Sequence, residues 1–497
     1  MENQEIDIKK ALSININNGK KNADIGNLTK GQQAAYKGLM EFINAPFNPN
    51  DFKRALVGYA GVGKTYLVKT LLKNCNISYS QIGLSAPSHK ACRVLRNSIA
   101  GISSKVNTIQ SDFGLRLNFN IENFDINNPP FDPRGRIKVE NYVLYIVDEA
   151  SMINAGLFNF MCKILKKNKC KLIVMGDDHQ LPPVNETKCQ AFVGIKTFYL
   201  TEIVRQEEDN PIRYLLDLLR YDIDHRTTHF INYISTNKEA FDSSFTKGFK
   251  VLDGAEFNNE VAKQFSDEQI TKNTDYVRVI AYTNNCVSYW NKTIRNAIIK
   301  DSDKSVITKN DLITSYTTIV DDFNDPVIRN SEDYIIKDIV NYVHPNYQLN
   351  GFMVKFQAIF GGYVTSPLFV INHKDLFTVQ MYCRLSAQLI EDAKNARKDM
   401  RAARWKEYYE FKESCLLLTN IGNNVGTILY QRDLDYGFAI TSHKSQGSTY
   451  NVAMIDINDM VYDKYGNPYS NIVDVNKRLY VALSRAKDKI YLKYDLH

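Results

Sequence analysis

One eight-residue stretch restricts the possible folds of this chain more than any other feature. The stretch Gly58-Tyr-Ala-Gly-Val-Gly-Lys64-Thr65 follows a short apolar run and precedes a helical pattern at 66–73. Its spacing, G-x-x-x-x-G-K-T, is that of a phosphate-binding loop, because glycines let backbone N–H groups close around phosphate oxygens at the start of a helix. An ordinary glycine-rich turn is the alternative, and the patterns on both sides disfavour it. The residues expected to surround a nucleotide phosphate are Gly58, Ala60, Gly61, Val62, Gly63, Lys64 and Thr65.

Two adjacent carboxylates follow another apolar run. Asp148 and Glu149 come directly after the run at 143–147. In such a site a lysine neutralises the phosphate oxygens, a threonine and an aspartate hold Mg²⁺, and the next carboxylate activates the attacking water. Lys64, Thr65, Asp148 and Glu149 match these four roles. A solvated strand end is the alternative for the acidic pair, and the upstream phosphate loop disfavours it. The predicted cofactors are ATP and Mg²⁺.

Further groups are needed where negative charge develops on the γ-phosphate. Gln180 lies in the loop at 176–183 after an apolar run, where a γ-phosphate sensor belongs. Arg205 and Arg485 are candidate arginine fingers. The alternatives are a polar loop for Gln180 and solvent-exposed charges for the two arginines.

Short apolar runs alternate with helical patterns in two parts of the chain, as in parallel sheets covered on both faces. The fold class predicted is α/β, with two lobes of parallel sheet. The expected strands are 54–58, 82–86, 143–147 and 172–175 in the first lobe, and 276–281, 436–440, 452–457 and 489–493 in the second.

Two segments interrupt this rhythm. Turn signals at 115–141 predict a small β insertion. About 150 residues of different texture separate the first two strands of the second lobe, with β-like runs at 333–337 and 353–356 and a charged helical segment at 385–415. The predicted domains are an N-terminal arm (1–27), lobe one (28–114 and 142–205), its insertion (115–141), lobe two (206–329 and 429–497) and a second insertion (330–428).

Composition excludes several classes of protein. The eight cysteines lie far apart without a C-x-x-C pair, which argues against a zinc site or a disulfide framework. The N-terminus is acidic and polar, and no run approaches the roughly 20 apolar residues that cross a bilayer. We expect a cytoplasmic protein without a membrane partner. The net charge of +7 suits a polyanionic partner without proving one.

The motifs, taken in order, resemble those of superfamily 1 helicases, in the RecD-like and Dda-like 1B branch. The resemblance runs over 28–493. The corresponding segments are 28–32 (Q motif), 58–65 (motif I), 84–91 (Ia), 107–111 (the Thr-Ile-His-Ser element), 148–151 (II), 176–183 (III), 204–206 (IV), 438–447 (V) and 480–486 (VI). The resemblance adds Gln32, as the reader of adenine, and Gly447 to the nucleotide-binding residues. Gln110 stands where the family often has histidine, and it keeps a polar side chain at this position.

The resemblance implies two RecA-like lobes with ATP between them, Arg485 coming from the second lobe. Single-stranded DNA would lie across both lobes, and cleft closure would drive translocation in the 5′ to 3′ direction of the 1B branch. The residues expected to contact nucleic acid are small or polar groups near strand ends, for which loop capping is the alternative. They are Pro87, Ser88, His89, Thr108, Gln110, Thr283, Asn284, Thr441, His443 and Lys444.

The two insertions correspond in place to the 1B and 2B domains of the family. The first would be the pin that wedges at the fork, and its candidate aromatics are Phe119, Phe124 and Phe131, with packing onto lobe one as the alternative. The second would be SH3-like with a helical extension. Bases and aromatics interleave at 394–411, which suggests either a nucleic-acid clamp or a solvated amphipathic helix.

The function predicted is an ATP-dependent DNA helicase acting on forked or tailed duplex. An RNA helicase of the Upf-like branch and a nucleotide-gated binding protein without unwinding activity are the alternatives. The expected partners are single-stranded DNA, tailed duplex and a single-strand-binding or replication and recombination protein, and the expected state is a monomer. The layout and the Asn/Lys/Ile-rich composition suggest a bacteriophage source, and hence the host cytoplasm.

Overall fold

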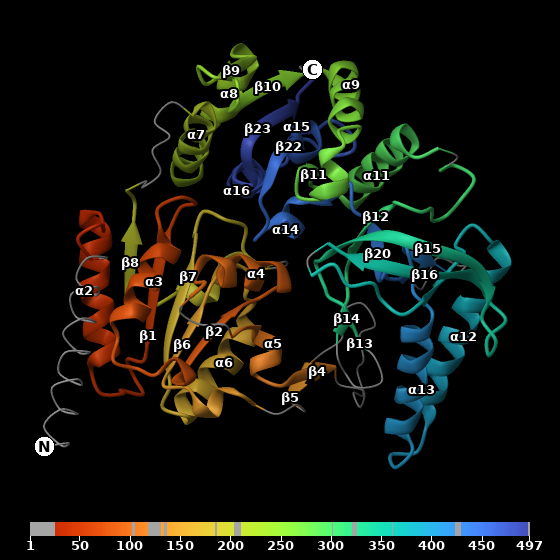
Figure 1. Cartoon of the computed structure of the whole chain (residues 1–497), viewed down its shortest axis with the longest axis horizontal. Coiled ribbons are helices and arrows are strands. Elements are labelled where there is room, and N and C mark those ends of the chain that lie inside the picture. Colours follow the sequence, from red (N-terminus) through yellow and green to blue (C-terminus); the bar gives the residue numbers. More distant parts are fainter. Residues whose placement is uncertain are drawn as a thin grey trace, which may run out of the picture. The chain divides into compact units, whose positions relative to one another are not determined.

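The computed structural model forms two compact units, and each is described by itself (Figure 1). The first unit comprises residues 1–114 and 135–208, and the second comprises 115–134 and 209–497. The structure describes residues 25–101, 105–117, 131–133, 137–183, 186–202, 210–300, 302–320, 326–359, 361–422 and 429–495. Most of the predicted N-terminal arm therefore lies outside the described residues.

A parallel sheet forms the centre of the first unit, with strand order β3-β2-β6-β7-β1-β8. All residues of β2, β6 and β7 are buried, which explains why continuous apolar runs predicted these strands. The strands are β1 (Lys53–Gly58), β2 (Ile82–Ala86), β3 (Val106–Thr108), β6 (Leu144–Val147), β7 (Lys171–Gly176) and β8 (Thr197–Leu200), and the α-helices are α2 (Lys30–Asn44), α3 (Lys64–Asn74), α4 (His89–Ser98), α5 (Ile109–Asp112) and α6 (Ala155–Lys167).

A second sheet has the order β21-β11-β22-β23-β10-β9 and is parallel except for β9. The predicted α/β class with two parallel-sheet lobes is thereby confirmed. The strands are β9 (Glu239–Phe241), β10 (Gly248–Leu252), β11 (Val277–Ala281), β21 (Ala439–Thr441), β22 (Tyr450–Asp456) and β23 (Ala486–Lys493). The helices are α7 (Pro211–His225), α8 (His229–Thr236), α9 (Gly254–Phe265), α10 (Gln269–Lys272), α11 (Asn284–Ile298), α14 (Ser442–Ser445), α15 (Ile457–Val461) and α16 (Ile472–Leu483).

An antiparallel sheet is inserted into the second unit, with order β17-β16-β15-β12-β20. Its strands are β12 (Leu312–Ser315), β15 (Asp333–Val343), β16 (Asn350–Ala358), β17 (Leu368–Ile371) and β20 (Leu434–Tyr436), with the small pairs β13 (Ile319–Val320) and β14 (Pro326–Ile328), and β18 (Ile421–Gly422) and β19 (Leu429–Tyr430). The boundaries 330–428 predicted for this insertion are wrong at both ends, since β12 precedes them and β20 follows them. β12 is only four residues long and buried throughout, so it shows no alternation.

The strand predicted at 436–440 is two strands in two different sheets. β20 ends at Tyr436 in the inserted sheet, and β21 begins at Ala439 in the parallel sheet. Gly437 lies between them and donates its N–H to the carbonyl oxygen of Leu312 at 2.8 Å. A Cβ atom on this glycine would lie 2.7 Å from the hydroxyl oxygen of Thr314. The chain therefore crosses from one sheet to the other through a site that is too close for a side chain.

The first insertion contains a strand pair, as predicted. β4 (Leu115–Leu117) pairs antiparallel with β5 (Phe131–Pro133). Its predicted end at residue 141 is too late, because Lys138 donates its backbone N–H to the carbonyl oxygen of Asp112 at 2.9 Å and Val139 is fully buried. Residues 137–141 therefore belong to the first unit.

The helical segment of the second insertion is a hairpin of α12 (Leu376–Asn395) and α13 (Arg401–Ser414), which lie side by side in Figure 1. Trp405, Tyr408 and Tyr409 of α13 are buried and pack together, with Leu389 and Ile390 against them. Positions 405, 408 and 409 share one helix face. The interpretation of this segment as a base-stacking clamp is wrong for these rings, because they form the interior of the hairpin.

Within the described residues, no helix combines the length and the apolar character that crossing a bilayer requires. All eight cysteines are described, and none forms a disulfide.

Candidate nucleotide and nucleic-acid sites

Three strand ends of the first unit carry the predicted phosphate and metal residues. β7 lies between β1 and β6, and Val57 of β1 is opposite Gly176 of β7. Because the three strands are parallel, Gly58, Asp148 and Asp177 all lie at the carboxyl edge of the sheet. Ligands of open α/β sheets bind at this edge.

The phosphate loop joins β1 to α3 in a backbone conformation that requires glycine. Gly61 and Gly63 have φ values of 87° and 77°, in the left-handed region. A Cβ atom on Gly58 would lie 2.6 Å from the carbonyl oxygen of Leu200. Lys64, at the start of α3, donates to the carbonyl oxygens of Gly58 and Tyr59, the latter at 2.9 Å. The loop thus curls around the lysine ammonium group.

Gln32 contacts the same loop from α2. Its side-chain amide donates to the carbonyl oxygen of Val62 at 2.9 Å, and the residue is 1% exposed. Thr29 caps α2 by accepting the backbone N–H of Gln32, and its own backbone N–H donates to the Gln32 side-chain oxygen at 3.1 Å, a reciprocal capping box. The structure therefore brings the Q-motif glutamine and the phosphate loop together.

The acidic pair follows β6. Burial raises the pKa of the Asp148 carboxyl, while the Lys64 ammonium and the backbone N–H of Glu149 lower it in part. Glu149 has a φ of 51°, a left-handed conformation that is uncommon for a residue with a side chain. An oxygen donor set of Thr65 and Asp148 suits Mg²⁺, which prefers carboxylate and hydroxyl oxygens.

The loop after β7 folds back on itself beside the phosphate loop. The His179 ring lies edge-on against Tyr59 at 5.4 Å between centroids, and Gln180 is 6% exposed. Asp177, Asp178 and His179 place potential metal-ligand atoms within 4.8 Å of one another, a cluster that our reading of the sequence missed. Asp177 accepts the backbone N–H of His179 at 3.0 Å, and Asp178 lies 3.1 Å from the imidazole Nδ1. These contacts connect neighbouring residues of the loop, and the His179 ring joins the loop to Tyr59.

Arg485 lies in the second unit between α16 and β23. It is 5% exposed, and its guanidinium donates to the carbonyl oxygens of Val481 at 3.0 Å and Ser448 at 3.2 Å. Ser448 follows Gly447, whose φ of 71° turns the motif V loop. The structure thus brings two predicted nucleotide-site residues of this unit together. Arg205, the other candidate finger, lies outside the described residues.

The predicted nucleic-acid residues of the first unit lie at two neighbouring strand ends. Ala86 of β2 is paired with Thr108 of β3. Ser88 caps α4 by accepting the N–H of Ala91 at 3.2 Å, and Thr108 caps α5 in the same way. Pro87 and His89 flank the first cap, and Gln110 lies in α5.

The second unit repeats this arrangement. Ala281 of β11 is paired with Thr441 of β21, and both Thr283 and Thr441 are helix N-caps. Four of the predicted hydroxyls therefore cap helices, because their oxygens accept backbone N–H groups, and their contact with nucleic acid stays a prediction. Burial lowers the pKa of the His443 imidazole, with Asp474 raising it and Arg478 lowering it further.

Three residues outside the predicted motifs contact the loops that follow β11 and β21. Asp459 of α15 accepts the backbone N–H groups of Tyr282 and Thr283 at 2.6 and 2.8 Å, and the Thr283 hydroxyl at 2.6 Å. Arg432 and Tyr316 contact Asn284 and Lys444. No local pattern in the sequence could indicate them, since each lies far along the chain from the loop that it contacts.

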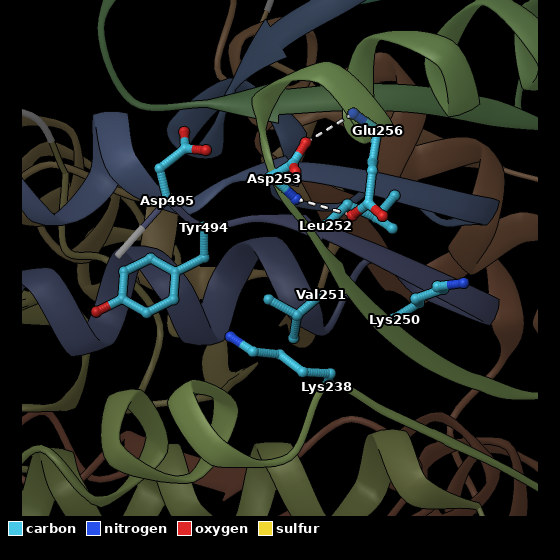
Figure 2. Close-up of a pocket in the computed structure, with 8 residues that line it drawn as sticks. All are labelled: Lys238, Lys250, Val251, Leu252, Asp253, Glu256, Tyr494 and Asp495. Atoms are coloured by element: carbon cyan, nitrogen blue, oxygen red, sulfur yellow. Dashed lines mark hydrogen bonds between the residues drawn. The ribbon is translucent and has the colours of Figure 1, made fainter. Parts of the chain in front are cut away.

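A pocket of about 480 Å³ lies at the end of β10 (Figure 2). None of the predicted site residues lines it. Asp253 and Glu256 form a reciprocal cap of α9, drawn as dashed lines in Figure 2, and Asp495 accepts the N–H of Gly254 at 2.8 Å. The acidic groups here are thus occupied with helix capping.

Of the three pin candidates, one lies in a described strand. Phe119 and Phe124 lie outside the described residues. Phe131 begins β5, where its backbone is paired with Leu117.

Comparison with known proteins gives one domain match and several long, distant similarities. Residues 27–233 match the family described as AAA domain. An uncharacterized protein of Acanthamoeba polyphaga mimivirus is 23% identical over 93% of this chain and 98% of its own length. The structure of the Pif1 helicase from Candida albicans is 16% identical over 94% of each chain, with a TM-score of 0.45. That of Pif1 from Bacteroides, in complex with ADP-AlF3 and single-stranded DNA, is 16% identical over 95% of this chain and 93% of that one, with a TM-score of 0.46.

Proposed function

We propose that this chain, which carries an AAA domain over residues 27–233, is an ATP-dependent DNA helicase of superfamily 1B that moves 5′ to 3′ on single-stranded DNA. One observation carries the proposal. Two parallel-sheet lobes repeat the same pair of capped strand ends, and the first lobe adds a phosphate loop with an acidic pair. A protein that translocates along a strand needs at least two nucleic-acid-binding sites and one site for ATP hydrolysis.

In this proposal the first lobe binds and hydrolyses ATP. The loop N–H groups and Lys64 hold the phosphates. Gln32 stabilises the loop through its hydrogen bond to the carbonyl oxygen of Val62. Thr65 and Asp148 would hold Mg²⁺, which neutralises charge on the phosphate oxygens when it is bound. Glu149 orients and deprotonates the attacking water, and Gln180 senses the γ-phosphate. Arg485 supplies positive charge to the transition state.

Nucleic acid would be held at the paired strand ends. Because the hydroxyls of Ser88, Thr108, Thr283 and Thr441 cap helices, they contribute mainly by fixing the loops. Backbone N–H groups and the exposed polar side chains of these loops would then meet the phosphates, without reading the sequence. The proposal includes action as a monomer on tailed or forked duplex DNA.

Unwinding assays on tailed duplexes test this function. The substrates carry a 5′ or a 3′ single-stranded tail, in DNA and in RNA, and Glu149→Gln serves as the inactive control. Unwinding of the 5′-tailed DNA alone, lost in the control, is the expected result. Activity on the 3′ tail would contradict the polarity, and activity on RNA alone would favour the Upf-like alternative. ATPase activity stimulated by DNA without strand separation would contradict the unwinding step.

A further inference from the structure

The inserted antiparallel sheet meets the parallel sheet of the second unit at Tyr316 and Arg432. Tyr316 follows β12 and Arg432 precedes β20, and these strands pair, with Ser315 opposite Leu434. Tyr316 also donates its backbone N–H to the carbonyl oxygen of Asp433 at 2.8 Å. The two side chains therefore emerge next to each other from one rigid edge of the inserted sheet.

Arg432 contacts three acceptors at once. Its guanidinium donates to the side-chain oxygen of Asn284 at 3.0 Å and to the hydroxyl of Tyr316 at 3.1 Å. It also pairs with the carboxylate of Asp435 at 2.8 Å, where the two side chains are 8% and 9% exposed. A planar, five-donor group suits this geometry, and a lysine could not make all three contacts.

The contact with Asn284 determines which way its amide points. Arginine has only donors, so the amide must present its oxygen to Arg432. Its NH₂ group is then turned away from the guanidinium on an exposed residue. Phosphate and sugar oxygens of DNA need donors of this kind. Arg432 thus holds Asn284 in the orientation that nucleic acid requires.

Lys444 of motif V is held at the same edge. Its ammonium donates to the carbonyl oxygen of Ser315 at 2.8 Å and lies 3.5 Å from the centre of the Tyr316 ring. Arg432 lies 4.4 Å from the centre of that ring. A single tyrosine therefore contacts two cations, and cation–π attraction steadies both. The two predicted DNA-contacting residues, Asn284 and Lys444, are thus linked through the inserted sheet.

A second cluster also consists of an arginine, an aspartate and a tyrosine, but it does not contact Asn284 or Lys444. Arg295 pairs with Asp311 at 2.8 Å and lies 4.7 Å from the ring of Tyr436. Its remaining bonds are to the backbone of Ser302 and Ser305 and to Thr308. These contacts involve none of the predicted DNA-contacting residues. A change at Arg295 should therefore affect stability as a change at Arg432 does, without affecting Asn284 or Lys444.

We infer that Arg432 is a positioning residue for single-stranded DNA, acting through Asn284 directly and through Tyr316 on Lys444. The inference rests on the proposed function. It makes the inserted sheet part of the DNA-binding surface of the second unit, although the Arg432 side chain is itself only 8% exposed. A change at Arg432 should then alter the DNA concentration that the enzyme needs and leave the chemistry of hydrolysis alone.

The test compares Arg432→Lys with the wild-type full chain. The probe is a fluorescein-labelled oligothymidylate, read by anisotropy, together with ATPase rates over a range of DNA concentrations. We expect the dissociation constant and the half-saturating DNA concentration to rise about tenfold, while the maximal rate changes less than about twofold. Asn284→Ala should weaken binding similarly. The effects of the two changes should be less than additive in the double variant, because both remove the contact between Arg432 and Asn284 and only the route through Tyr316 to Lys444 remains to be lost.

Arg295→Lys is the matched control, since it disturbs an equivalent Arg–Asp–Tyr cluster. It should lower the melting temperature comparably and leave DNA affinity unchanged. If it weakens DNA binding as much as Arg432→Lys does, the inference is overturned. Where Arg432→Lys fails to fold, Tyr316→Phe removes one bond of Arg432 and should weaken binding about two- to threefold. Wild-type affinity in both Arg432→Lys and Tyr316→Phe would refute the inference, whereas a wild-type chain that does not bind the oligonucleotide would refute the proposed function.

Discussion

The ammonium group of Lys64 donates a hydrogen bond to the carbonyl oxygen of Tyr59 at 2.9 Å, so the phosphate loop is closed around its own lysine. Replacing Lys64 by Ala should reduce DNA-stimulated ATP hydrolysis at least about 100-fold, because the charge facing the phosphates is lost. Binding of single-stranded DNA should change less than about threefold, since β6 and β7 separate β1 from the strands that carry Ser88 and Thr108. Lys69→Ala, on the same helix, is the control. Retained hydrolysis in Lys64→Ala would refute the phosphate site.

Asp459 should matter for DNA binding through the loop that it holds. Asp459→Asn replaces one carboxylate oxygen by an NH₂ group, so either the N–H groups of Tyr282 and Thr283 or the Thr283 hydroxyl loses its acceptor. We expect single-stranded DNA to bind about five- to tenfold more weakly in anisotropy titrations. Asp463→Asn is a matched control, because Asp463 also accepts two backbone N–H groups, from Tyr465 and Asn467, in a different loop. Equal effects of the two changes would contradict the assignment.

The pin prediction needs three single variants. Phe119→Ala, Phe124→Ala and Phe131→Ala are compared for strand separation and for DNA-stimulated ATPase. At least one should lower the unwinding rate several-fold more than the ATPase rate, since an aromatic wedge acts on the duplex and not on ATP. Unchanged unwinding in all three would show that the pin assignment is wrong.

Trp405 is expected to stabilise the helical hairpin and not to bind DNA. The side chain is 1% exposed, so Trp405→Ala should cost about 3–5 kcal/mol of local stability. Thermal unfolding should show an earlier transition, with DNA affinity at low temperature unchanged. Lys406→Ala, the exposed neighbour, should alter neither. Loss of DNA affinity with an unaltered melting profile would revive the clamp interpretation.

Asp435 makes the stability of the second unit depend on pH. Burial raises the pKa of its carboxyl to about 6, with Arg432 and Lys444 lowering it in part. Because the folded pKa lies above the unfolded value of 3.8, the folded state binds the extra proton between these values, and stability falls as pH rises from about 4 to about 6. Asp435→Asn cannot ionise.

The stability of Asp435→Asn relative to the wild type should therefore rise over that range, by about 3 kcal/mol from a shift of roughly two pKa units. Melting temperatures of both proteins at pH 4.5, 6 and 7.5 measure this change. A constant difference at all three values would contradict the raised pKa.

Buried parallel strands were the part of the fold that local pattern predicted best. Strands such as β2 and β7 are covered on both faces, so each is a continuous apolar run. β10 escaped prediction because Gly248 and Lys250 interrupt its run, and β12 because it is short. The pattern at 436–440 looked like one strand because both halves are apolar, while the crossing at Gly437 depends on a neighbour more than 120 residues earlier.

The residues of the candidate sites also differ in whether local sequence could predict them. Lys64, Asp148 and Thr441 are recognisable because their roles depend on a strand end and the residues next to it. Arg432 and Asp459 have roles that come only from folding, since the loops they hold lie 148 and 176 residues away along the chain. Local spacing carries no information about such pairs. The capping role of the hydroxyls was foreseeable as an alternative, because serine and threonine before a helix are common N-caps.

Only Gly437 and Phe438 separate the inserted sheet from the strand that ends at Thr441. Gly437 is enclosed by Leu312, Thr314 and Arg278, so a rotation of β20 relative to β21 at this link would have to displace their side chains. If the parallel sheet of the second unit rotates during an ATP cycle, the inserted sheet would rotate with it. A displacement of a few ångströms at motif V would then become a larger sweep at the far end of the α12–α13 hairpin.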